Sequence, residues 1–529
     1  YKAGLDIKVN DRDGRFNVQS YTTFDHLRNN ETANTWRTNF LSSGDTYDRI
    51  MRKTDSKQWR LFTYNTQSLF PKIAGEKAWL SFSQYFNYRK RDNDACALSA
   101  TTGSDWETFS KNQLDSLYSP NITPELRKKL INRNLSRSLG RTTYMDGKVS
   151  ASISARMAHS SDGYQLRANL WMESNDYELY NQQRIDYVDA QQVETQFVNN
   201  YSKTNPTRSY KYEFSGMYDY RPFEGLEFHF GYAYEQRYKV ESRSLYRLDR
   251  LEGWDNDIDH GIGTLPSEEL YLQTIDVNNS YNSRTLTRVH IPEVGMNWLI
   301  HVNKKWDFNI FNAIQMPLCS QTLKYAGADA DTTFTRRSTQ LRIYNSRFRL
   351  LTNDYKHHFI LEYGLDPQTP NLRYLVRATD DADPLNVTRG GRNLKDIHYY
   401  YTKLTYDYRG RMMVSPSIYY NRTNNAVSMG YVYDKATGRR TVTPASINGN
   451  WRAGAGLSLS GALDKKRLLM FSNNLNADFV NSADYIGSDE AKPMGKSIVK
   501  TWNVSERLRL DYKIGRHSIG FSGTFSWLR

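Results

Sequence analysis

Three aspartates at alternate positions form the strongest metal-binding pattern in the chain. They lie in the stretch WDNDIDHGIG, as Asp255, Asp257 and Asp259. Oxygen ligands at alternate positions of a loop suit a hard cation such as Ca²⁺. The calcium-loop pattern is incomplete, because His260 stands where a glycine is required and Pro266 where a bidentate glutamate is required. A solvated acidic loop is the favoured interpretation, a loop Ca²⁺ site is the alternative, and no other cofactor is expected.

Other signals for catalysis or redox chemistry are weak. The chain contains no GxSxG, HExxH or P-loop pattern, so no enzyme class is indicated. His357 and His358 are explained as polar residues of a turn that precedes a strand. Cys96 and Cys319 are the only cysteines and form no CxxC pair, so no metal or redox motif is present. The sequence leaves open whether these two cysteines form a disulfide.

The composition describes a polar, aromatic-rich chain. Its 529 residues include 39 Tyr, 22 Phe and 11 Trp, which argues against disorder because disordered chains are poor in aromatics. The hydrophobic fraction is 38%, below the ~45–50% that is usual for globular proteins, and the mean hydropathy is −0.75. No stretch approaches about 18 consecutive apolar residues, so the sequence predicts no transmembrane helix.

The net charge of +14 has two interpretations. A strongly basic chain can bind nucleic acid or another polyanion. Charge can also be spread over loops and a water-filled interior. The basic residues form no compact block, which favours the second interpretation, and no nucleic-acid partner is expected.

Alternating polarity is the dominant pattern of the chain. In GYQLRANLWMES (163–174), apolar side chains fall on every second residue and polar ones lie mostly between them. The same period recurs at 149–157, 226–234, 507–512 and 517–527. A period of two predicts β-strands that have one apolar and one polar face.

Short turns and long polar loops alternate between these strands. Tight turns are expected at 11–14, 72–77, 158–163, 222–225, 302–305, 354–358, 409–411, 463–467 and 513–517. Long loops are expected at about 91–142, 177–206, 247–281, 366–395 and 481–494, the first with a short helix capped by Thr123. Nine tight turns predict about eighteen strands, with all short turns at one end. This asymmetry is typical of outer-membrane barrels.

The predicted fold is therefore all-β: a transmembrane, antiparallel up-and-down β-barrel with long extracellular loops and short periplasmic turns. Closure would place every apolar face in lipid and every polar face in an aqueous lumen. The residues expected to face lipid are Leu166, Ala168, Leu170, Phe228, Phe230, Leu508, Leu510 and Phe521. The aromatic residues expected at the membrane interface are Trp79, Trp306, Tyr408 and Tyr512.

A family resemblance is strongest at 364–408. There a strand enters a proline-containing loop with DPLN at 383–386 and GRNL at 391–394, followed by a Tyr-rich strand. This arrangement resembles the barrel region of TonB-dependent receptors, and in particular SusC-like outer-membrane proteins of the Bacteroidota type. Arg392 departs from the family pattern as an inserted residue.

The resemblance implies a 22-stranded barrel that is filled by a plug domain and driven by a TonB-type energy coupler. With about eighteen strands and no plug pattern, residues 1–529 are expected to be the outer-membrane β-barrel domain without its N-terminal plug and last strands. The implied function is uptake of a bulky nutrient, such as a glycan, peptide or metal chelate, by gated passage. The implied partners are outer-membrane lipid, the energy coupler, and a surface lipoprotein or other outer-membrane subunits.

Two other functions remain open at the level of the sequence. One is a structural barrel subunit of a multi-protein outer-membrane assembly for secretion, lipoprotein export or barrel insertion, without active transport. The other is a soluble, basic β-protein that binds nucleic acid. The pattern of alternation alone predicts only a wide outer-membrane barrel, and the cargo has no signature in it.

Overall fold

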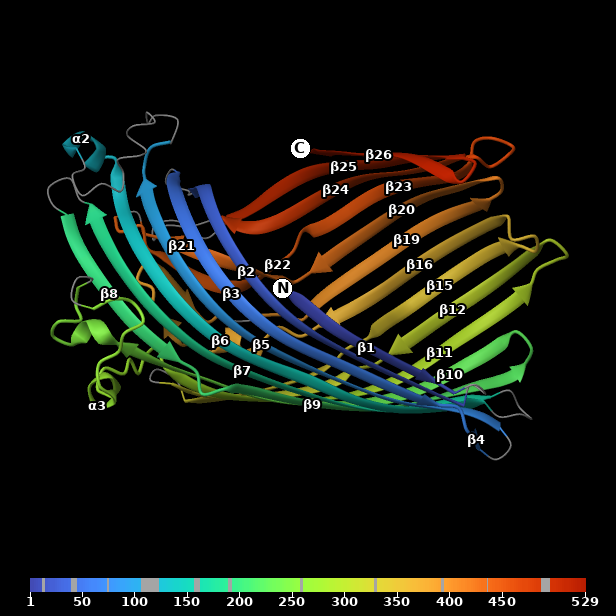
Figure 1. Ribbon diagram of the computed structural model, residues 1–529, viewed down its shortest axis with the longest axis horizontal. Helices are drawn as coiled ribbons and strands as arrows, with labels where there is room; N and C mark the ends of the chain where they lie inside the picture. The colour runs from blue at the N-terminus through green and yellow to red at the C-terminus, as the bar shows by residue number, and fades with distance from the viewer. Residues whose placement is uncertain are drawn as a thin grey trace.

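The structure of the chain is a computed structural model. It describes residues 1–11, 15–39, 45–73, 76–105, 123–156, 162–188, 193–256, 260–327, 331–391, 394–434, 436–486 and 495–529. Most of these residues belong to one large antiparallel sheet that curls around a long axis (Figure 1).

The first half of this sheet contains the longest strands. They are β1 (Lys2–Asn10), β2 (Phe16–Asn39), β3 (Thr46–Leu69), β4 (Lys72–Ile73), β5 (Glu76–Thr102), β6 (Leu130–Arg156), β7 (Gly163–Val188), β8 (Val193–Lys203), β9 (Thr207–Phe223), β10 (Leu226–Arg247) and β11 (Tyr281–His301). A tilted strand crosses a bilayer with about 9–11 residues. Strands of 27 residues, such as β5 and β6, therefore extend well beyond a membrane on one side.

The second half of the sheet has shorter strands at first. They are β12 (Trp306–Gln315), β13 (Leu318–Gly327), β14 (Thr332–Thr339), β15 (Arg342–Thr352), β16 (His357–Gln368), β19 (Ile397–Arg409), β20 (Met412–Asn424), β23 (Asn450–Ala462), β24 (Leu469–Ile486), β25 (Gly495–Ile514) and β26 (His517–Leu528). The 12 and 13 residues of β16 and β19 are close to the length that a membrane crossing needs.

The 22 strands of this sheet make eighteen passes. In three cases two consecutive strands together make one pass with a short interruption, namely β8 with β9, β12 with β13, and β14 with β15. The two-residue β4 makes no pass. Each pass is antiparallel to the one before it. The prediction of about eighteen antiparallel strands in up-and-down order is confirmed.

Six of the nine predicted turns lie within the described residues, and each joins two antiparallel neighbours. The turn at 222–225 joins β9 to β10, and those at 302–305, 354–358, 409–411, 463–467 and 513–517 make the same kind of connection. These turns gather at the right-hand end of Figure 1, opposite α2 and α3. The turns at 11–14, 72–77 and 158–163 lie wholly or partly outside the described residues.

In two of the predicted long loops most of the described residues are strand, which corrects the expected boundaries. In the segment 91–142, β5 runs to Thr102 and β6 begins at Leu130. In 177–206, β7 and β8 pair with each other as a ladder. These strands continue beyond the part of the wall that needs an apolar face. Their side chains are therefore as polar as those of a loop, although their backbone groups are still paired in the sheet. The capped helix is confirmed, because the backbone N–H of Leu126 donates to Thr123 Oγ1 at 3.4 Å at the start of α2 (Pro124–Arg127).

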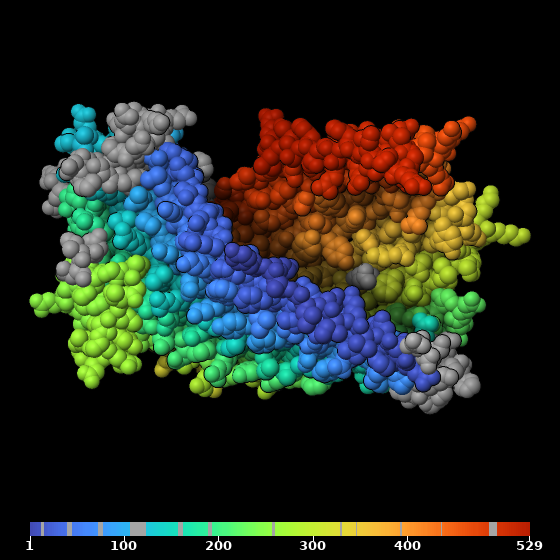
Figure 2. All heavy atoms as spheres, viewed as in Figure 1, coloured from blue at the N-terminus to red at the C-terminus, as the bar shows by residue number. Residues whose placement is uncertain are grey.

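The first and last strands leave the wall open. β1 pairs with β2 and β26 pairs with β25, and no ladder among the described residues joins β1 to β26. Figure 2 shows the recess between the blue N-terminal strands and the red C-terminal strands. The closure that the sequence predicts is therefore not completed by the strands described, and both edges carry unpaired backbone groups.

A second, small sheet lies at the loop end of the wall. It contains β17 (Thr379–Asp380), β18 (Asn386–Arg389), β21 (Ala426–Tyr433) and β22 (Arg440–Ile447), and β18 pairs with β22 in parallel. The short helices of the same end pack on the large sheet, namely α3 (Glu268–Leu272) on β10, the 3₁₀ helix η2 (Leu248–Arg250) on β8 and the 3₁₀ helix η3 (Leu372–Leu375) on β13. None of the helices in the described ranges has the length and apolar character to cross a membrane.

Candidate functional site

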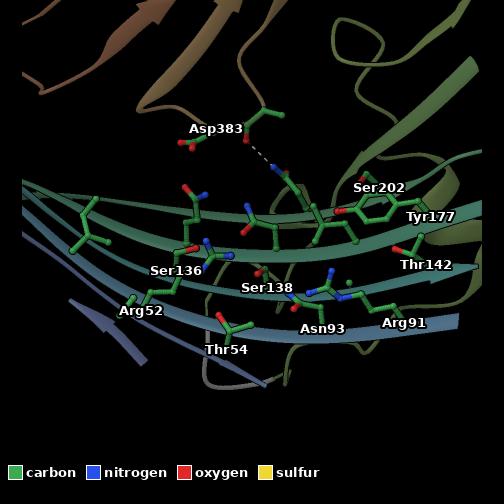
Figure 3. A pocket seen from close by; sticks show the side chains of 18 of the residues that line it. Arg52, Thr54, Arg91, Asn93, Ser136, Ser138, Thr142, Tyr177, Ser202 and Asp383 are labelled. Carbon is green, nitrogen blue, oxygen red and sulfur yellow. Dashed lines mark hydrogen bonds between the residues drawn. The ribbon is translucent and has the colours of Figure 1, made fainter. Parts of the chain in front are cut away.

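A polar cavity of about 950 Å³ lies on the inner surface of the wall (Figure 3). Its floor is formed by the halves of β2, β3, β5, β6, β7 and β8 that extend toward the loop end, and Ala382 and Asp383 lie over it. Because side chains of a strand alternate between faces, every second residue of these strands points into the cavity.

Strand register aligns the polar side chains of the floor in rows. In one row, Thr54 lies opposite Ala95, Ala95 opposite Ser138, Ser138 opposite Asn181, and Asn181 opposite Asn200. Directly opposite residues in an antiparallel sheet have neighbouring Cβ atoms on the same face. Short side chains thus form the floor across five strands, with hydroxyl or amide groups on four of them and Ala95 on the fifth.

The roof of the cavity is held to the wall by side chains of β8 and of the segment before β11. The Asn200 amide donates to the carbonyl oxygen of Ala382 at 2.9 Å. Asn279 and Asp381 are joined twice, since the Asn279 amide donates to Asp381 Oδ1 at 2.7 Å and Asn279 Oδ1 accepts from the Asp381 N–H at 3.0 Å. We call residues 380–384 the latch. The latch closes the loop end of the cavity through bonds to two different parts of the wall.

An ion pair adds to these bonds and accounts for part of the charge around the cavity. Arg243 Nη1 lies 2.8 Å from Asp380 Oδ2, and the Arg243 guanidinium also donates to the carbonyl oxygen of Asn279. Arg37, at the edge of the cavity, lies 3.9 Å from Asp48. Even with these two pairs, the residues that line the cavity include more arginines than carboxylates.

The sequence gives the latch its local shape but does not indicate its position. In DADPLN (381–386), Asp383 Oδ1 accepts from the Leu385 N–H at 3.1 Å, which is a local turn of the kind that aspartate favours. This stretch belongs to the family-like pattern at 364–408, but nothing in its residues indicates that it lies over the lumen. Its contacts with Asn200 and Asn279 span more than 100 residues of sequence, so alternation along one strand could not reveal them.

The residues predicted to face lipid lie on the opposite surface of the wall. Leu166, Leu170, Phe230 and Phe521 are exposed, and Ala168, Phe228, Leu508 and Leu510 are partly exposed. Register places them in outward rows, with Leu166 opposite Ile153 and Leu510 opposite Phe521. An apolar recess of about 730 Å³ on this surface is lined by Leu80, Phe82, Ile153, Leu166 and Phe214, among others. Contact of these residues with lipid stays a prediction.

Three of the four predicted interfacial aromatics lie on this outward surface beside short turns. Trp306 lies 6.4 Å from Phe359 between ring centroids, Tyr408 pairs with Val414, and Tyr512 pairs with Ile519. Trp79 differs, because it lies opposite Ser154 and hence on the polar face. Its neighbour Leu80 lies opposite Ile153 on the outward face. Trp79 therefore does not lie on the outward face, where the prediction of an interfacial ring requires it.

A second group of aromatic rings lies toward the loop end and was not recognised as a group from the sequence. Tyr420, Trp451, Phe479 and Trp502 follow one another across four strands, with ring centroids 6.1, 5.2 and 4.9 Å apart. Ten residues separate Trp502 from Tyr512 along β25, which at the usual rise and tilt of a barrel strand is about 25 Å. That is the height of the apolar band of a membrane barrel.

One polar pair interrupts this band. Asn473 lies opposite Leu508, Glu506 lies opposite Leu475, and the Asn473 amide donates to Glu506 Oε1 at 2.7 Å. Both residues share the outward face with Leu510. The hydrogen bond satisfies part of the polar capacity of each side chain, which is the usual condition for a polar group in an apolar environment.

The predicted loop metal site is only partly described. Asp257 and Asp259 lie outside the described residues, and the His260 ring stacks on Trp254 with centroids 3.9 Å apart. The Ca²⁺ site stays a prediction. Another group, on β9 and β10, brings His229 Nδ1 to 2.7 Å from Asp219, and Arg221 pairs with the neighbouring Glu227. These ion pairs explain that group without a metal.

The remaining candidate residues lie apart from the cavity. Cys96 on β5 and Cys319 on β13 are both free and partly buried, so they form no disulfide with each other. His357 Nδ1 is 2.8 Å from the Tyr406 hydroxyl, beside the short turn predicted from the sequence. Neither pair forms a catalytic arrangement.

Comparison with known proteins gives the class of the fold. Residues 350–520 match the model of the outer membrane protein beta-barrel family. This range includes the stretch 364–408. The wall of antiparallel strands is thus that of an outer-membrane β-barrel, located in the outer membrane. No curated protein sequence matches the chain significantly.

Solved structures of outer-membrane receptors and transporters resemble the chain in overall arrangement. The copper transporter OprC is 8% identical, with 96% of this chain and 87% of that one covered and a TM-score of 0.43. The ferripyoverdine receptor of the outer membrane of Pseudomonas aeruginosa is 10% identical, with 100% and 64% covered and a TM-score of 0.41. The alcaligin receptor FauA from Bordetella pertussis is 8% identical, with 96% and 75% covered and a TM-score of 0.34.

Proposed function

We propose that this chain is the barrel wall of a TonB-dependent type of outer-membrane receptor that takes up a bulky nutrient by gated passage. The observation that carries the proposal is the cavity roofed by the latch. A wall that served only as a scaffold would need neither a polar cavity of about 950 Å³ on its lumen side nor a loop segment bonded across it. Ligand sites are concave and carry a small number of convergent polar groups, and this cavity has both properties.

In this mechanism the chain binds and admits the nutrient without covalent chemistry. The nutrient enters from the loop end when the bonds of Asn200 and Asn279 to the latch open. It then rests on the floor of the cavity until an energy coupler of the TonB type drives it onward. The outward residues, such as Leu166 and Phe521, contact outer-membrane lipid and keep the wall fixed while the latch moves.

Growth of cells that carry or lack the intact gene tests this function. On panels of single nutrients, we expect a growth defect in the deletion strain on one class of glycan, peptide or metal chelate. The wild-type gene should restore growth, and a protonophore should abolish uptake because the inner membrane supplies the energy. A deletion that leaves all nutrients usable but lowers the amounts of other outer-membrane proteins would contradict uptake and support the structural subunit.

A further inference from the structure

Two arginines of the cavity have no carboxylate partner among the described residues. Arg52 on β3 and Arg91 on β5 both line the cavity, and neither lies within 4.0 Å of a described carboxylate oxygen. The guanidinium groups are always charged and present five donors in a fixed plane. Unpaired arginines that face an enclosed polar space are suited to a carboxylate or phosphate of a ligand.

The two arginines are separated along the cavity. Arg52 lies opposite Ala97 and Arg91 opposite Gln58, so six residues of β5 separate their rows. At the usual rise of a strand this is about 20 Å. Figure 3 shows Arg52 and Arg91 at opposite sides of the view, with Ser136, Ser138 and Asn93 between them. A single small anion could therefore not bind both, whereas an extended ligand with repeated negative charges could.

The floor between the arginines offers hydrogen bonds from uncharged side chains, while the carboxylates of Glu31 and Asp383 also line the cavity. It is formed by short hydroxyl and amide side chains, namely Thr54, Asn93, Ser136, Ser138, Thr142, Asn181, Gln183, Asn200 and Ser202. Two of these residues are buried and have an amide oxygen without a partner, Gln183 Oε1 and Asn200 Oδ1. Buried polar atoms are nearly always hydrogen-bonded. Both oxygens have almost no accessible surface, so a ligand would form its hydrogen bonds with the accessible hydroxyl and amide groups of the cavity.

Aromatic side chains contribute little to the cavity. Tyr177 is the one aromatic residue among those that line it. A flat aromatic chelate would find a single ring to stack on, and a greasy peptide would meet mainly polar groups. The combination of spaced arginines and short hydroxyl and amide side chains is matched best by a chain of sugar units that carry carboxylates.

We infer that the cavity binds an acidic oligosaccharide, with carboxylates on Arg52 and Arg91 and sugar hydroxyls on the surface between them. This inference rests on the proposed function, because it names the nutrient class that would pass through the same cavity. Each arginine forms a charge-assisted pair with one carboxylate, and the hydroxyl surface selects sugar over other polyanions.

Calorimetry on the purified full-length protein in detergent tests the inference with trigalacturonate and the neutral maltotriose as probes. We expect trigalacturonate to bind and maltotriose to bind at least about 10-fold more weakly, since each lost charge-assisted pair removes more than a neutral hydrogen bond does. The variants Arg52→Gln and Arg91→Gln should each weaken trigalacturonate binding about 10-fold.

The chain offers matched controls on the same strands. Lys53 and Lys90 are the neighbours of the two arginines and point to the opposite face of the sheet. Lys53→Gln and Lys90→Gln remove the same charge and should leave the affinity unchanged. Equal binding of maltotriose, equal loss in the lysine variants, or equal binding of triglutamate or inorganic phosphate would each overturn the inference.

The two proposals fail in different ways. Binding in detergent requires neither energy nor passage, so trigalacturonate that binds but supports no uptake in cells would overturn the proposed function and keep this inference. Uptake of another nutrient class by a protein that does not bind trigalacturonate would overturn this inference and keep the proposed function.

Discussion

The outer and inner faces of the same strands make different demands on the sequence. On the outer face, Ile153, Leu166 and Gly216 lie in one row across β6, β7 and β9. One residue along, Arg167 lies opposite Ser152 on the inner face. The outer rows require only apolar side chains, so many residues can serve at each position. The inner rows combine particular charges and hydrogen bonds, so they determine what the lumen can bind.

The largest effect that distinguishes the two faces is expected from a charge on the outer one. Leu166→Arg should lower the free energy of unfolding in lipid vesicles by about 2–4 kcal/mol if the residue lies near the midplane. Gln165→Arg places the same side chain one residue earlier, on the inner face, and should change that free energy by less than about 0.5 kcal/mol. Equal losses in the two variants would show that the faces are not in different environments.

A smaller effect is expected at the latch, on the inner side only. The double change Asn200→Ala and Asn279→Ala removes the bonds to Ala382 and Asp381. Loss of these three hydrogen bonds should lower the free energy of local opening by about 1–3 kcal/mol, measured by hydrogen exchange of the Asp381 amide. Asn278→Ala changes an exposed neighbour and should leave the exchange rate as it is. If the double variant exchanges at the wild-type rate, these bonds do not hold the latch.

The smallest effect compares two glutamates, one on each face. Glu506 accepts from Asn473 on the outer face, and Glu293 accepts from Gln315 at 2.7 Å on the inner face. Glu506→Gln should raise the free energy of unfolding in vesicles by less than about 2 kcal/mol, because it removes a charge from the apolar band. Glu293→Gln should give no such gain. A gain at Glu293 alone would reverse the assignment of the faces at these rows.

The fold could be predicted largely because alternation and turn residues are local signals. The period of two placed Leu166 and Phe521 on one face, and short polar turns such as 409–411 marked one end of the wall. The same signals failed at the loop end. There β5 and β6 continue as strands without an apolar face, and their polar sequence is indistinguishable from that of a loop.

The site was less predictable because it depends on contacts between distant segments. Arg52 and Arg91 are ordinary polar positions of alternating strands, and only the register of β3 with β5 shows that they line one space. The pairing of β18 with β22 in parallel, which positions the stretch after the latch, joins segments that no short-range pattern connects. Sequence alternation identifies the inward residues as a class without selecting those that form a cavity.

The recess between β1 and β26 has a consequence for the width of the lumen. The diameter of a barrel grows with its number of strands, and a bilayer tolerates no strand edge whose backbone groups lack partners. The way in which these two edges are satisfied therefore sets the circumference of the wall and the width of its lumen. The width of the lumen is thus set at this junction, which lies only two strands away from β3 and its cavity residue Arg52.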